Sequence, residues 1–277
     1  MTAAALRRPS GRFRAVASSV RSAPAPAGVP DVAVRDLRVS YGAQLVLDGV
    51  DLAISHGETV ALLGASGSGK STLMRSLTGF APISSGDVRV AGRDVAAVRG
   101  TELRRLRADV GQVFQQFNLQ PRLSVLTNVL TGALYSSGPI NLAGGFSSHH
   151  RRHAMELLDR VGIADKARDQ ARTLSGGQQQ RVAIARALMQ QPRVILADEP
   201  VASLDPSLAD SVLGLLRSIS SEDGIPVLVS LHVVPLALAH SDRIVGLREG
   251  RVVVSAETCG VDAAALACLY DGGGATT

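Results

Sequence analysis

The 277-residue sequence predicts an α/β fold with an antiparallel edge sheet and an inserted helical subdomain. Residues 59–64, 193–200 and 225–232 contain continuous apolar runs, each followed by sequence compatible with a helix, as in parallel strands buried on both faces. Residues 32–42 instead alternate apolar and polar side chains, which is typical of a half-buried antiparallel strand. Between 115 and 181 no such strand pattern occurs.

The first 30 residues predict a disordered basic tail. They are rich in Ala, Ser, Pro and Arg and contain five arginines but no acid, which accounts for the whole net charge of +5. Residues 31–277 are therefore close to neutral and form the predicted folded domain, and a nucleic-acid partner has no support from charge. An organellar transit peptide remains an alternative for the tail. No segment is long enough in apolar residues to span a bilayer.

The domain begins with the edge sheet, because 45–58 repeats the alternation of 32–42 with Gly at the turns. The buried strand 59–64 follows, and then a helix over 71–79 with Leu73 and Leu77 on one face. A strand, a glycine-rich turn and a helix thus succeed one another at the start of the parallel sheet.

The helical subdomain is predicted at approximately 116–180, with a helix near 152–163. Within it, residues 147–153 place three histidines beside two arginines, and we expect a solvated loop there and no metal site. After the last parallel strand the sequence predicts a strand pair over 242–257 and a short helical stretch near 262–270.

The glycine-rich turn carries the first functional motif, G-x-x-x-x-G-K-[ST], between a buried strand and a helix. Small residues let a polyphosphate lie against main-chain N–H groups at the positive end of the helix, where bulky side chains would hold it away. A lysine then meets the β- and γ-phosphates, and a serine hydroxyl ligates Mg²⁺. The candidate ATP-binding residues are Gly64, Ala65, Ser66, Gly67, Ser68, Gly69, Lys70, Ser71 and Thr72.

Two carboxylates end the buried strand 194–199. Burying Asp198 and Glu199 is costly unless a cation or a donor meets them. Beside a phosphate-binding loop, Asp198 is expected to face Mg²⁺ and Glu199 to polarise the attacking water.

Residues 174–188, LSGGQQQRVAIARAL, resemble the signature motif of ABC-transporter ATPase subunits. A second small-residue helix N-terminus, formed by Ser175, Gly176, Gly177 and Gln178, suits a γ-phosphate. The resemblance implies a P-loop NTPase core and a head-to-tail dimer that sandwiches two ATP molecules, each held by the loop of one subunit and the signature turn of the other.

The remaining motifs of this family follow in the expected order. Tyr41 resembles the aromatic residue that stacks on adenine, and Gln115 the glutamine that senses Mg²⁺ and the membrane partner, with Gln116 as the alternative. Asp205 matches the loop that crosses the dimer interface, and His232 the switch histidine at the γ-phosphate. With Glu199 and Lys70, His232 completes the expected catalytic set.

The sequence of residues 199–206 departs from the commonest family pattern, because Val201, Ala202 and Ser203 replace a usual Thr-Ser-Ala. That change, residues 114–134 and the polar insert 135–153 resemble the phosphonate-importer branch. The assignment of a substrate rests on this resemblance alone, since the ATPase subunit need not touch the transported molecule.

The resemblance implies an ATPase on the cytoplasmic face of the cell membrane. It would use ATP and Mg²⁺ to drive uptake of phosphonate or a related phosphorus oxyanion, with an integral-membrane permease and an extracytoplasmic substrate-binding protein as partners. The alternatives are the ATPase of another importer or of an exporter, or a soluble ABC ATPase acting on nucleic acid or the ribosome. The last class usually carries two cassettes or long charged insertions, neither of which this sequence shows.

Overall fold

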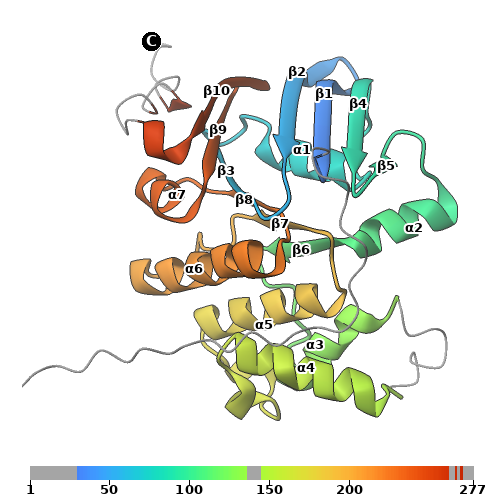
Figure 1. Ribbon diagram of the computed structural model, residues 1–277, viewed down its shortest axis with the longest axis vertical. Helices are drawn as coiled ribbons and strands as arrows, with labels where there is room; N and C mark the ends of the chain where they lie inside the picture. The colour runs from blue at the N-terminus through green and yellow to red at the C-terminus, as the bar shows by residue number, and fades with distance from the viewer. Residues whose placement is uncertain (1–29, 136–144, 262–265, 267–268, 271–277) are drawn as a thin grey trace, which may run out of the picture.

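A computed structural model describes residues 30–135, 145–261, 266 and 269–270, in which two sheets organise the chain (Figure 1). The predicted tail lies outside the described residues apart from Pro30. Most of the helical stretch expected near 262–270 and the middle of the polar insert, 136–144, also lie outside them.

The edge sheet is antiparallel, as predicted, and has the strand order β2-β1-β4-β5. Gly42, with φ 60°, turns the chain between the first two strands. The sequence pattern does not predict the last two strands, which are short and contribute few apolar residues. The strands are β1 Val32–Tyr41, β2 Gln44–Ile54, β4 Ser85–Val90 and β5 Arg93–Asp94.

The second sheet has the order β10-β9-β3-β8-β7-β6. All neighbours are parallel except β9 and β10, which form the predicted antiparallel strand pair. Parallel strands align their carboxyl ends at one edge, so residues that follow β3, β6, β7 and β8 lie near one another. The strands are β3 Thr59–Leu63, β6 Val110–Phe114, β7 Val194–Asp198, β8 Val227–Ser230, β9 Arg243–Arg248 and β10 Arg251–Glu257.

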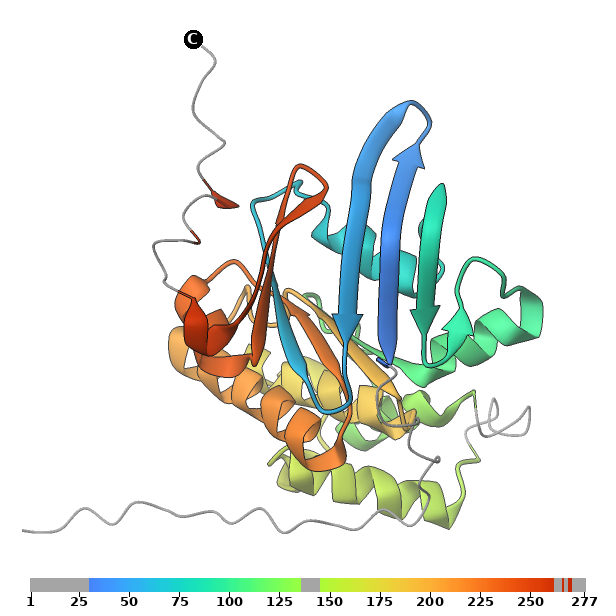
Figure 2. The same ribbon diagram turned by 45° about the horizontal axis from the view of Figure 1, so that its top comes forward.

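The central strands are buried on both faces, which explains their continuous apolar sequences. On β3, Val60 and Leu62 pack into a cluster with β1, β2, β4 and the first helix. The intervening Ala61 and Leu63 pack into the second cluster, which most of the other helices line. Figure 2 shows the edge sheet standing beside the six-stranded sheet, with α3, α4, α5 and α6 on the opposite side.

Helices α3, α4 and α5 gather below α6 in Figure 1, and α5 packs on both α3 and α4. They fall largely within the predicted helical subdomain, whose limits at 116 and 180 stay a prediction. The α-helices are α1 Lys70–Leu77, α2 Gly100–Asp109, α3 Val125–Leu130, α4 Ser148–Arg160, α5 Gly176–Met189, α6 Pro206–Asp223 and α7 Val234–His240. Short 3₁₀ turns lie at Thr131–Ala133, Ala164–Lys166, Ala171–Thr173 and Thr258–Gly260.

The expected solvated loop at 147–153 is wrong, because all but its first residue belong to α4. The Ser147 hydroxyl caps this helix by accepting from the His150 N–H at 3.2 Å. Ala154, Leu157 and Leu158 on the same helix are buried, and this apolar face holds the polar first turns in helical conformation.

Among the described residues, every helix is too short or too polar to span a lipid bilayer.

Candidate functional site

The loop between β3 and α1 has a backbone that requires glycine. Gly64, Gly67 and Gly69 have φ of 154°, 78° and 109°. A Cβ on Gly64 would lie 2.6 Å from the Ser68 Oγ, and one on Gly69 would lie 2.7 Å from a methyl group of Leu47. Gly69 is the N-cap of α1 and supplies no side-chain cap, so the first N–H groups of the helix stay available to an anion.

Lys70 lies inside this loop and is 5% exposed. Its Nζ donates to the carbonyl oxygens of Gly64 at 2.7 Å and Ala65 at 3.0 Å. Burial lowers the pKa of the Lys70 ammonium, although the nearby charges of Glu199 and Asp198 raise it. An ammonium group has three N–H donors, so this arrangement leaves one donor for a phosphate oxygen.

The two carboxylates at the end of β7 are held by the neighbouring strand β8. The Ser230 hydroxyl donates to the Asp198 Oδ1 at 2.8 Å and accepts from the Glu199 N–H at 2.8 Å. Glu199 adopts the left-handed backbone region with φ 48°, which is uncommon for a non-glycine residue. The strand ends at Asp198, and both carboxylates line the cavity described below.

His232, the expected γ-phosphate residue, lies beside Glu199. Its Nε2 lies 2.6 Å from the Glu199 Oε1, and both side chains are partly exposed. The His232 carbonyl accepts from the Tyr270 hydroxyl at 3.4 Å. Burial raises the pKa of Tyr270, and a hydrogen bond with the Gly64 backbone opposes this rise. Tyr270 thus bridges the glycine-rich loop and the His232 loop.

A cavity of about 250 Å³ brings the predicted metal residues together. Ser71, Gln115 and Asp198 all line it. Gln116 lines it as well, so the geometry does not choose between the two glutamines. The donors are a hydroxyl, amides and a carboxylate, the hard oxygen ligands that Mg²⁺ takes beside substrate phosphates. The cavity is lined by Ser71, Phe114, Gln115, Gln116, Asn118, Asp198 and Glu199.

The signature turn is a helix N-terminus of a different kind. The Ser175 Oγ accepts from the Gln178 N–H at 3.4 Å, and the Gln178 Oε1 accepts from the Ser175 N–H at 3.0 Å, which forms a capping box on α5. Gly176 lies against Leu204, where a Cβ would come within 3.2 Å. No described residue of the 174–178 segment lines the cavity beside Ser71.

Two other predicted residues lie apart from this cavity. Asp205 is exposed and caps α6, where its Oδ1 accepts from the Leu208 N–H at 3.0 Å. Tyr41 ends β1 and is 43% exposed, which leaves its ring available for stacking. Both are accessible at the protein surface.

Sequence reasoning missed Ser230, Tyr270 and Arg186. Ser230 ends the strand next to β7, so the pairing of parallel strand ends could have indicated it. The guanidinium of Arg186 donates to the carbonyls of Phe117 and Asn118 in the loop after Gln115. No local sequence signal indicates the contacts of Tyr270 or Arg186, because both span long stretches of chain.

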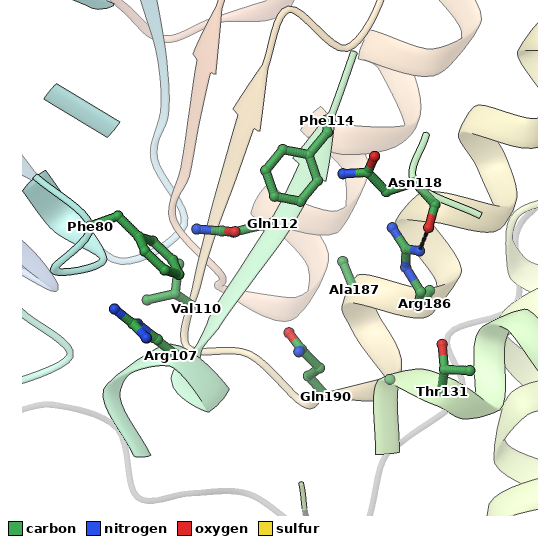
Figure 3. Close-up of a pocket in the computed structure, with 11 residues that line it drawn as sticks. Phe80, Arg107, Val110, Gln112, Phe114, Asn118, Thr131, Arg186, Ala187 and Gln190 are labelled. Atoms are coloured by element: carbon green, nitrogen blue, oxygen red, sulfur yellow. Dashed lines mark hydrogen bonds between the residues drawn. The ribbon is translucent and has the colours of Figure 1, made fainter. Parts of the chain in front are cut away.

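A second cavity of about 360 Å³ lies between the six-stranded sheet and the helices (Figure 3). Arg107 forms one wall, with its guanidinium carbon 3.7 Å from the centre of the Phe80 ring. Arg186 forms the opposite wall, where Figure 3 shows it beside Asn118. We call this cavity the groove; its other lining residues are Val110, Gln112, Phe114, Thr131, Gly132, Ala187 and Gln190.

Comparison with known proteins gives concordant results. The family model described as ABC transporter matches residues 47–202. The chain is 51% identical over 237 residues to the phosphonates import ATP-binding protein PhnC of Frankia casuarinae, covering 84% of this chain and 93% of that protein. It is 50% identical over 234 residues to the phosphate-import ATP-binding protein PhnC of Mycolicibacterium smegmatis, covering 83% and 88%.

Among solved structures, the chain resembles the dimeric post-hydrolysis state of the ATP-binding cassette MJ0796 bound to ADP and Pi. The TM-score is 0.72 at 34% identity, and the match covers 83% of this chain and all of that one. The predicted fold class is thereby confirmed.

Proposed function

Because the chain belongs to the ABC transporter family, we propose that it is the ATP-hydrolysing subunit of an importer for phosphonate or a related phosphorus oxyanion. The main support for the ATPase assignment is the cavity beside the buried Lys70. It joins Ser71 and the loop that carries Gln115 and Gln116, which we call the glutamine loop, to Asp198 and Glu199. Similarity to a phosphonates import protein and to a phosphate-import protein supports the substrate class.

ATP binds first through the glycine-rich loop in this proposal. The uncapped N–H groups of α1 and the Lys70 ammonium offer fixed positive charge to the β- and γ-phosphates. Lys70 already lies in a low-dielectric position, so a phosphate oxygen would interact with it more strongly than in water. The exposed Tyr41 ring would stack on adenine.

Hydrolysis requires a water directed at the γ-phosphorus. Glu199 accepts a proton from this water or orients it, while the bond from the γ-phosphorus to the bridging oxygen breaks and yields ADP and phosphate. The contact of 2.6 Å between His232 and Glu199 fixes the carboxylate, and Ser230 fixes the backbone that carries it. Lys70 and the loop amides stabilise the negative charge that develops.

Ser71, Asp198 and either Gln115 or Gln116 would hold Mg²⁺, directly or through water. When bound, Mg²⁺ would neutralise charge on the β- and γ-phosphates. The described residues contain no cluster of three or more His, Cys, Asp or Glu suited to a metal. A magnesium site that depends on substrate phosphates agrees with this donor set.

Dimerisation completes the site in our proposal. Ser175, Gly176, Gly177 and Gln178 of one subunit would face the γ-phosphate held by the other subunit, and Asp205 would lie at the interface between them. The similarity to a cassette whose solved structure is a dimer bound to ADP and Pi supports a contribution from a second copy. ATP binding then closes the dimer, and hydrolysis reopens it.

The groove is the proposed contact for the membrane permease. It combines exposed apolar surface at Phe80, which is 57% exposed, with the guanidinium groups of Arg107 and Arg186. A coupling helix of the permease that seats there would place the subunit at the cytoplasmic face of the membrane. The complete importer would include an extracytoplasmic substrate-binding protein.

Reconstitution of the subunit with its permease in proteoliposomes tests this function. ATP turnover is measured with the substrate-binding protein loaded in turn with a phosphonate, phosphate or phosphite. We expect stimulation by one or more of these ligands. Equal turnover with loaded and empty binding protein would contradict coupling, and co-purification with RNA in place of a membrane protein would favour a soluble ABC ATPase.

A further inference from the structure

The chain between Gln115 and α3 contains a turn with unusual backbone geometry. Phe117 and Asn118 have φ of 37° and 51°, so two consecutive non-glycine residues occupy the left-handed region. This region is disfavoured for residues with a Cβ, and adjacent residues in it need support from outside the turn.

Arg186 supplies that support from the third turn of α5. Its Nη2 donates to the Phe117 carbonyl at 2.8 Å, and its Nη1 donates to the Asn118 carbonyl. Within the described residues, no other side chain donates to these two carbonyls. A planar guanidinium can satisfy both oxygens at once, whereas a single ammonium point charge lacks this fork geometry.

The turn separates the two cavities of the protein. Gln115 and Gln116 line the cavity beside Ser71, which we call the nucleotide cavity. Asn118 lines both this cavity and the groove, and Arg186 lines the groove. Arg186 is partly buried, and this burial lowers the pKa of its guanidinium, which still lines the groove. A molecule in the groove can therefore contact the same guanidinium that holds the glutamine loop.

We propose that Arg186 is a positioning residue that fixes the Gln115–Gln116 loop against the nucleotide cavity and links the loop to occupancy of the groove. The inference rests on the proposed ATPase function and deepens it. Arg186 does not touch the reacting atoms, since it acts through two backbone carbonyls and the glutamines that precede them.

The test compares Arg186→Met and Arg186→Lys with the matched control Arg181→Met. Arg181 lies on the same helix but donates to the Val161 carbonyl at 2.5 Å and to the Ser211 Oγ at 2.7 Å, away from the glutamine loop. Each variant is measured for thermal stability, ATP turnover, and equilibrium binding of a fluorescent ATP analogue with and without Mg²⁺.

We expect Arg186→Met to lower turnover about tenfold and to reduce the gain in analogue affinity that Mg²⁺ produces in the parent protein. Binding without Mg²⁺ should stay unchanged, because the glycine-rich loop is intact. Arg186→Lys should be intermediate and keep the fold if Arg186→Met loses it. Arg181→Met should lower the melting temperature without changing the effect of Mg²⁺.

A double-mutant cycle separates this inference from the proposed function. Replacing Gln115 and Gln116 with Ala should by itself lower turnover, and Arg186→Lys should then have no further effect. Full additivity in the cycle, or an unchanged Mg²⁺ effect in both Arg186 variants, would overturn the role of Arg186. Normal ATP turnover in the variant with Ala at both Gln115 and Gln116 would instead count against the proposed role of the glutamine loop.

Discussion

The helices α1 and α5 both begin with small residues, yet their N-termini differ. Gly69 begins α1 in a left-handed conformation and offers no side-chain cap. Ser175 begins α5 and closes a capping box with Gln178. The first N-terminus is thus open to an anion and has Lys70 beside it, whereas the second satisfies two of its own donors and has no described lysine or acid in its first turn.

This difference predicts an order of events. The glycine-rich loop can bind ATP in a single subunit, because its donors and its charge are already in place. The signature turn must exchange part of its capping box for the γ-phosphate, so it contributes when a second subunit delivers the nucleotide to it. Small residues at a helix start therefore do not by themselves establish equal affinity for phosphate.

The largest expected effect comes from Glu199→Gln. The glutamine keeps the shape of the side chain but cannot accept the proton of the attacking water, so turnover should fall about 10²- to 10³-fold. ATP binding should persist, and closed dimer should accumulate in gel filtration with ATP. Turnover close to that of the parent protein would remove Glu199 from its role.

Lys70→Met should weaken ATP binding about 30-fold or more, because it removes a buried charge that faces the phosphates. Although Lys70→Met weakens ATP binding, it should stabilise the folded protein in the absence of nucleotide. Burial lowers the pKa of Lys70, so the charged form destabilises the folded state relative to the unfolded one, and methionine removes that cost. We expect the nucleotide-free variant to melt at or above the parent temperature. A clearly lower melting temperature would show that the bonds to Gly64 and Ala65 outweigh the cost of burial.

Ser175→Ala tests the other helix start. Loss of the N-cap should lower the free energy of unfolding by about 1 kcal/mol. ATP affinity at concentrations where the protein is monomeric should not change, while formation of closed dimer in a Glu199→Gln background should weaken. Weaker binding of ATP by the monomer would contradict the contrast between the two N-termini.

Ser147→Ala gives the smallest effect on function. It removes the N-cap of α4. This helix packs with α3 and α5, and none of its residues lines either cavity. Urea unfolding should show a loss of about 1 kcal/mol, as for Ser175→Ala, with ATP binding and dimer closure unchanged. Together, the two serine variants separate the structural value of a helix cap from a role at the nucleotide.

Much of the fold could be predicted because its central strands are buried on both faces and carry long apolar runs. Short elements such as β4 and β5 bury few side chains and leave a weak pattern. The helix at 148–153 was missed because its polar first turns are held by apolar residues that come later, Ala154, Leu157 and Leu158.

The candidate site likewise contains residues that a local sequence pattern predicts and residues that it does not. Local motifs predicted Lys70, Asp198 and Glu199, since a strand end and the next few residues determine their surroundings. Ser230 and Arg186 act through contacts 31 and 69 residues away along the chain. Such contacts depend on how the strands and helices pack, which a local pattern does not contain.

The central claim is that ATP is held between the Lys70 loop of one subunit and the Ser175 turn of another. Mixed dimers test it directly when each kind of subunit carries a different affinity tag and two-step purification removes the homodimers. All subunits carry Glu199→Gln to suppress turnover, and retained labelled ATP is measured after gel filtration. Subunits with Lys70→Met are mixed with subunits with Ser175→Arg, and in parallel subunits with both changes are mixed with subunits with neither.

We expect the two single variants to restore ATP retention when mixed, since the mixed dimer has one composite site with both Lys70 and Ser175 intact. Dimers of doubly changed and unchanged subunits should retain none, because each of their sites lacks one of these residues. Retention in the second mixed dimer but not in the first would place Lys70 and Ser175 of one subunit around the same nucleotide and contradict a site shared between two subunits.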